Sequence, residues 1–217
     1  MRLEIDPSLR LTYPGLGAHL VVVRGLRVRE HDPRLESFAQ ALVDEFRGHL
    51  RLESLKDEPS LRSYRDFYWR VGIDPTKIRP ASEALLRRVL QGKPLPRINT
   101  LVDAYNLASM KTHVAIAAFD AARLVGDVLT MRLSRAGETF LGIQMDAPMA
   151  LQGHEVVVQD RNALVAIYPY RDAETTKVTL ATTDTVFMTC GVPGISDETL
   201  DSADVTTTEF VERFCRD

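Results

Sequence analysis

The sequence predicts an α+β fold, with a β-rich, sandwich-like core in the second half of the chain flanked by helices mainly from the first half. Up to Lys111, apolar residues recur mostly at helical spacing. After Lys111, short apolar runs rich in Val and Thr alternate with turn residues, which is typical of strands. Because the two patterns are segregated along the chain, they argue against an alternating βαβ arrangement.

The first half begins with a buried strand over residues 18–28 and continues with helices. Asp32-Pro33 is a helix start, and Leu35, Phe38, Leu42, Val43 and Phe46 form one apolar stripe behind it. A second helix is expected over residues 60–71 and a third from Pro80 to Gly92. Thr100 is expected to cap a fourth helix, with Asp103 in the acidic capping position.

The second half contains seven short apolar runs that we interpret as strands. They cover residues 115–119, 127–133, 139–143, 155–158, 163–168, 178–181 and 184–189. A final helix is expected after a cap at Ser196 or Asp197.

The composition is that of an ordinary globular protein. The chain has 217 residues, of which 45% are hydrophobic, so it is long enough to bury a large core. Cys190 and Cys215 stand apart without a CxxC motif, which favours reduced thiols over a disulfide framework or structural zinc. The N-terminus lacks a signal-peptide pattern and no run reaches the ~18 apolar residues of a membrane span. We therefore expect a cytoplasmic protein without a membrane partner.

The net charge of −3 hides a strong local asymmetry. Between Leu61 and Arg97, nine Lys/Arg face three Asp/Glu, a balance of +6, so the remainder sums to −9. Aromatic residues interrupt the basic run in "SYRDFYWR". Such a stripe is either the footprint of a polyanion or a solvated helix face. Under the first interpretation the RNA-binding candidates are Arg62, Arg65, Lys77, Arg79, Arg87, Arg88, Lys93 and Arg97.

No motif points to a cofactor or metal. The chain has no Walker loop, HExxH or GxSxG, and its five histidines are scattered in sequence. We therefore expect neither a metal nor a cofactor.

One stretch carries a family resemblance. "RINTLVDAYNLAS" followed by "AAFD" is similar to "RPINxVVDxTNYV…PxHAFD" in the B3/B4 region of the bacterial phenylalanyl-tRNA synthetase β subunit, and "MRLSRAGETFLGI" resembles that family's "vRxAxxGExL" segment. "YRDFYWRVGIDPTKIRPASEALLRR" resembles free-standing B3/B4-domain proteins. The resemblance implies one domain over residues 1–217, with a strand and helix extension (1–60), a family core (61–191) and a C-terminal helix (192–217).

The resemblance also implies an editing pocket that hydrolyses misacylated tRNA. The pocket asparagine falls on Asn106, whereas the histidine before "AFD" falls on Ala117 and the glutamate that recognises a tyrosine hydroxyl falls on Thr189. Losing that contact would remove much of the preference for tyrosine. The implied catalytic candidates are Asn106 and Thr189. The pocket candidates are Thr100, Asn106, Ala117, Glu138, Tyr168, Tyr170, Arg171 and Thr189.

Three functions remain open at this point. The first is a trans-acting aminoacyl-tRNA deacylase, whose activated ester needs only a positioned water and a few hydrogen-bond donors. The second is a non-catalytic RNA-binding module that kept the fold. The third is a protein that binds a free amino acid or another small metabolite.

Overall fold

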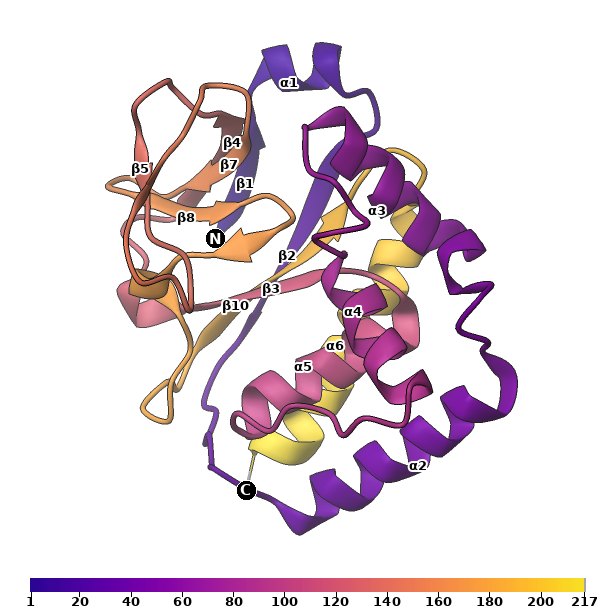
Figure 1. Ribbon diagram of the computed structural model, residues 1–217. Coiled ribbons are helices and arrows are strands. Elements are labelled where there is room, and N and C mark those ends of the chain that lie inside the picture. Colours follow the sequence, from indigo (N-terminus) through magenta and orange to yellow (C-terminus); the bar gives the residue numbers. More distant parts are fainter. Residues whose placement is uncertain (217) are drawn as a thin grey trace.

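The computed structural model describes residues 1–216, and Figure 1 shows two groups of strands beside a group of helices. A five-stranded sheet has the order β1-β4-β7-β8-β9. Only β1–β4 is a parallel pair within it, and the other neighbours are antiparallel. Its strands are β1 (Arg2–Ile5), β4 (Val128–Leu133), β7 (Val156–Gln159), β8 (Leu164–Ile167) and β9 (Arg171–Asp172). A short hairpin joins β5 (Thr139–Phe140) to β6 (Met149–Ala150).

A three-stranded antiparallel sheet forms the middle layer. It contains β2 (Gly17–Val23), β10 (Thr185–Gly191) and β3 (Ile116–Asp120), with β10 at the centre and buried along its whole length. Because side chains alternate along a strand, Val186 and Met188 pack toward the five-stranded sheet, whereas Phe187 packs toward the helices. The two sheets thus enclose one apolar core, and the helices close a second.

The helices cover the other face of the middle sheet, as Figure 1 shows for α5 and α6. The six α-helices of residues 1–216 are α1 (Pro7–Thr12), α2 (Pro33–His49), α3 (Pro59–Arg70), α4 (Ala81–Leu90), α5 (Thr100–Thr112) and α6 (Asp197–Cys215). Short 3-10 turns cover Leu55–Asp57, Ala121–Arg123 and Glu174–Thr176. Helices α1 and α3 instead face the core between the sheets, to which α1 contributes Leu9 and α3 contributes Tyr64, Phe67 and Tyr68. Trp69 of α3 remains exposed.

The predicted α+β class is confirmed, and most predicted elements are present. The Asp32 side chain caps α2 as expected by accepting a hydrogen bond from the backbone N–H of Arg34. Ser196 caps α6 in the same way. Asp217, the last residue of the expected C-terminal segment, lies outside the described residues.

Four details differ from the sequence-based expectations. Residues 2–5 and 7–12 form a strand and a helix that were not predicted. The strand expected over 18–28 ends at Val23, because Gly25 turns the chain with φ of 69° and its N–H donates to the Asp184 carboxylate. Residues 178–181 are a turn, closed by a hydrogen bond from the Thr179 N–H to the Thr182 hydroxyl. The cap of α5 is Asn99, one residue before the expected Thr100.

Two further expectations concern the thiols and the membrane. Cys190 and Cys215 are both free and buried, as the sequence predicts. Across residues 1–216, no helix combines the length and apolar character needed to cross a bilayer.

Candidate functional site

A groove between α2, α4 and α5 is the main candidate site. It has a volume of about 330 Å³, which falls in the range of small-molecule pockets. Its floor is apolar, with Leu35, Val43, Val89 and Leu107, and polar side chains enter from α5. The segment between α4 and α5, residues 92–97, forms one rim. We name this feature the α2–α4–α5 groove.

Helix α5 supplies the polar wall of the groove. Its N-terminus is fixed by Asn99, whose side chain accepts a hydrogen bond of 2.9 Å from the Val102 N–H. Thr100, Asp103 and Asn106 then follow at three-residue spacing and all line the groove, because residues three apart share one helix side. Thr100 and Asn106 are therefore the two predicted pocket residues that the structure brings together here.

Asp103 is the titratable group in this wall. Burial raises the pKa of its carboxyl group to about 6, whereas a hydrogen bond of 3.0 Å from the Ile98 N–H and the nearby Arg97 and His31 act in the opposite direction. The carboxylate is consequently ionised at neutral pH but less hydrated than a surface aspartate. That combination suits a general base that accepts a proton from water.

Cationic side chains lie along the rim of the groove. Lys93 and Arg97, both predicted RNA contacts, line it together with Arg47 of α2. Arg97 forms an ion pair of 3.1 Å with Glu36, while Arg47 donates to the Val89 carbonyl. The lining also includes Glu30, Asp32 and Glu36, so the groove carries both positive and negative side chains around the buried Asp103.

The remaining predicted RNA-binding residues mostly have local partners. Arg65 donates to both carboxylate oxygens of Glu83, at 3.0 and 3.1 Å, and Arg79 approaches the same buried carboxylate at 4.0 Å. Arg62 and Lys77 form loose ion pairs on the surface. Arg88 donates to the Pro94 carbonyl, whereas Arg87 and Lys93 have no carboxylate within 4.0 Å among residues 1–216. Part of the predicted basic stripe is thus engaged within the fold.

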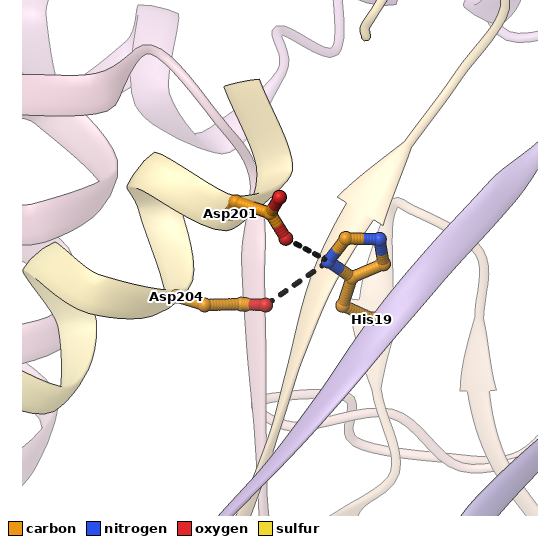
Figure 2. Close-up of side chains that lie close together, drawn as sticks. All are labelled: His19, Asp201 and Asp204. Carbon is orange, nitrogen blue, oxygen red and sulfur yellow. Dashed lines mark hydrogen bonds and ion pairs between the residues drawn. The ribbon is translucent and has the colours of Figure 1, made fainter. Parts of the chain in front are cut away.

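Thr189 lies in a different environment from Asn106. It is buried on β10, and its hydroxyl donates a hydrogen bond of 2.7 Å to Oδ1 of Asp204 on α6. Asp204 in turn faces His19 of β2 (Figure 2). Thr189 does not line the α2–α4–α5 groove, so the structure does not bring the two catalytic candidates into one pocket.

Ala117 and Tyr168 belong to the core between the sheets. The Tyr168 hydroxyl has its one proton to share between the carbonyls of Gly17 and Gly191, at 2.7 and 2.9 Å, and therefore links the end of β8 to the middle sheet. Burial raises the pKa of Tyr168 well above its usual value. These contacts give the first tyrosine of "YPYRDAETTK" a packing role.

The other predicted pocket residues lie beside the five-stranded sheet, with Arg171 in its edge strand β9 and Glu138 next to β4. The Arg171 guanidinium stacks on Tyr170, 5.0 Å from the ring centre, and donates to the Ile143 carbonyl at 2.7 Å. Glu138 accepts hydrogen bonds from both Nη atoms of Arg132, at 2.6 and 2.9 Å. Tyr170, Arg171 and Glu138 do not line the α2–α4–α5 groove.

Sequence reasoning missed Asp103 as a site residue because it was assigned to helix capping. Its three-residue spacing from both Thr100 and Asn106 was the available signal, since that spacing places all three on one side of α5. The contribution of α2 to the groove has no local signal, because it depends on tertiary packing.

Comparison with known proteins defines the class of this chain. Two packed sheets with helices on the outer face of one of them define an α+β domain. The chain belongs to the B3/4 domain family, whose model matches residues 63–216. This family membership confirms the resemblance seen in the sequence.

A solved structure shares the fold. It is an N-terminal fragment of the phenylalanyl-tRNA synthetase β subunit from Pyrococcus horikoshii, with a TM-score of 0.50 and 14% identity. The match covers 97% of this chain and 48% of that structure, so this chain spans about half of its length. No curated protein sequence matches this chain.

Proposed function

We propose that this protein binds the aminoacylated 3′ end of tRNA and hydrolyses its ester, with the α2–α4–α5 groove as the aminoacyl site. The observation that supports the proposal is that Asp103, Asn106 and Thr100 line one wall of a groove whose rim includes Lys93 and Arg97. Membership of the B3/4 domain family supports an RNA substrate of this kind. A cytoplasmic location follows from such a substrate.

The chemistry needs a water held between a base and the ester carbonyl. Asp103 is the base in this proposal, since its pKa of about 6 keeps it ionised and basic at neutral pH. Asn106 orients the water or stabilises the developing oxyanion through its side-chain amide. Lys93 and Arg97 attract the phosphates of the acceptor end. The proton passes from water to Asp103 and then to the departing ribose oxygen.

Hydrolysis of a panel of aminoacyl-tRNAs by the purified protein tests the proposal. At least one pair should be deacylated, and Asn106→Ala should slow that reaction about 100-fold, as for loss of one oxyanion donor. Asp103→Asn should slow it by a factor on the order of 100 and remove an inflection near pH 6, above which the wild-type rate is highest. The matched control is Asn162→Ala, in the exposed turn between β7 and β8.

The assay has two outcomes that contradict the proposal. Equal rates for the wild type and both groove variants would place the chemistry outside the groove. Absence of deacylation on every pair, together with tRNA binding that weakens steeply with salt, would indicate a non-catalytic RNA-binding module.

A second candidate function is binding of a free amino acid in the same groove. The observation in its favour is that Arg65, Arg79 and Arg97 already have acidic partners, which reduces the charge available to RNA. Titration with the free amino acids separates the two functions. Saturable binding of an amino acid without salt-sensitive tRNA binding would favour this second candidate.

A further inference from the structure

His19, Asp201 and Asp204 form a cluster on the side of the middle sheet that α6 covers. His19 comes from β2, and both aspartates come from α6, as Figure 2 shows. The His19 Nδ1 atom lies 3.0 Å from Oδ2 of Asp204 and 3.5 Å from Oδ1 of Asp201. Asp201 and Asp204 are three residues apart, so α6 presents both carboxylates on one side. The cluster is separate from the α2–α4–α5 groove.

The spacing of these atoms fits a shared metal ion. One ligand atom from each residue lies within 4.8 Å of the other two. Metal–nitrogen and metal–oxygen bonds of about 2.1 Å at tetrahedral angles place neighbouring ligand atoms about 3.4 Å apart. The two distances to His19 are close to that value. Imidazole nitrogen with carboxylate oxygen is a donor set that divalent transition metals use.

Asp204 is held in place by a residue outside the cluster. Thr189 is buried, and its hydroxyl donates to Oδ1 of Asp204, which leaves Oδ2 turned toward His19. This contact has the form of the outer hydrogen bonds that orient metal-ligating carboxylates. Asp201 is more exposed, with 72% of its side chain accessible, so it completes the set from the solvent side.

A third carboxylate and a neighbouring cavity lie beside the cluster. A third carboxylate, Asp197, lies 3.9 Å from the other His19 nitrogen. Three aspartates around one imidazole leave an excess of negative charge that a divalent cation offsets. His19 and Asp197 also line a second cavity of about 320 Å³, between the start of β2 and the end of β10. Asp201 and Asp204 do not line this cavity, so it adjoins the cluster only at His19 and Asp197.

We propose that His19, Asp201 and Asp204 bind a divalent transition-metal ion, with Zn²⁺ as the best-fitting probe. Thr189 is a positioning residue for this site, because it acts through Asp204. The proposal stands independently of the aminoacyl-tRNA function, since the two sites share no residue.

Equilibrium dialysis of chelator-treated full-length protein against Zn²⁺, with the bound metal measured by mass spectrometry, tests the site. The wild type should bind one equivalent at micromolar Zn²⁺. His19→Gln and Asp204→Asn should each weaken binding at least 100-fold, and Asp201→Asn about 10-fold. His49→Gln is the matched control, because His49 also lies near a carboxylate, that of Glu45 at 3.8 Å, but on the exposed face of α2.

Two further measurements test the metal site without the ligand variants, which could fail to fold. In histidine-ring nitrogen NMR spectra of the wild type, the His19 signal should shift on Zn²⁺ addition and the other four should not. Thr189→Ala should weaken Zn²⁺ binding 10- to 100-fold and Thr189→Ser should restore it, as expected for an outer hydrogen bond. Zn²⁺ binding that survives in both the His19 and Asp204 variants, or no bound equivalent at millimolar Zn²⁺, would overturn the proposal.

Discussion

Replacing Asp172 by asparagine should remove a pH dependence from the stability of this fold. Asp172 ends β9, at the edge of the five-stranded sheet, and its carboxylate accepts a hydrogen bond of 3.3 Å from the Ala118 N–H of β3. Burial raises the pKa of this carboxyl group to about 7 from its ordinary value of 3.8. Its environment thus favours the protonated form.

The raised pKa of Asp172 makes the folded protein less stable as the pH rises. The folded protein holds the Asp172 proton more tightly than the unfolded chain, so the stabilisation is complete below the unfolded pKa and is lost as the pH rises through about 7. For these two pKa values, proton linkage gives a loss of roughly 2.5 kcal/mol between pH 5 and pH 8. We expect about 2 kcal/mol, because the half-buried side chain retains some hydration.

Urea denaturation followed by circular dichroism, at several pH values from 5 to 8, measures this effect. The free energy of unfolding of Asp172→Asn minus that of the wild type should rise by about 2 kcal/mol over the range, because titrations common to both proteins cancel. Asp146→Asn, in an exposed loop, is the control for losing one negative charge. If the difference in free energy of unfolding between Asp172→Asn and the wild type does not change with pH, burial does not raise the pKa of Asp172.

Two other stability measurements test contacts in the core. Arg65→Met should lower the free energy of unfolding by about 3–5 kcal/mol, because Glu83 is fully buried and would lose the Nη1 donor that contacts both of its carboxylate oxygens. Arg62→Met, at an exposed position, should change it by less than about 0.5 kcal/mol. Tyr168→Phe should cost about 1–3 kcal/mol, because it removes a buried hydroxyl that donates to the backbone of the middle sheet. An unchanged midpoint in chemical denaturation would contradict the contribution of that contact.

The sequence predicted those elements whose signals are local. The apolar stripe and the Asp32 cap identify α2 because helical periodicity and capping act within one segment. Strand β10 is an apolar run long enough to be recognised. By contrast, β1 has an alternating exposed and half-buried pattern and is fixed by its parallel pairing with β4, more than 120 residues away.

The candidate site was predicted only in part, for a similar reason. Thr100, Asp103 and Asn106 follow one another at three-residue intervals on α5, so the sequence spacing makes each the neighbour of the next along the groove. Thr189 was assigned to the same pocket because it aligns with a pocket residue of the resembling family. In the structure, its side chain lies on the face of β10 that α6 covers, and its hydroxyl donates to Asp204. The His19 cluster joins β2 to a helix about 180 residues later, which only the tertiary structure reveals.

The central claim is that the α2–α4–α5 groove receives the aminoacyl end of tRNA. NMR chemical-shift mapping with an aminoacyl-adenosine analogue, in which an amide replaces the ester, tests it most directly. The predicted result is a set of shifted backbone signals that includes Asp103, Asn106 and Arg97 and disappears in Asn106→Trp, which fills the groove. Shifts confined to other parts of the chain, or none at a saturating concentration of the analogue, would contradict the claim.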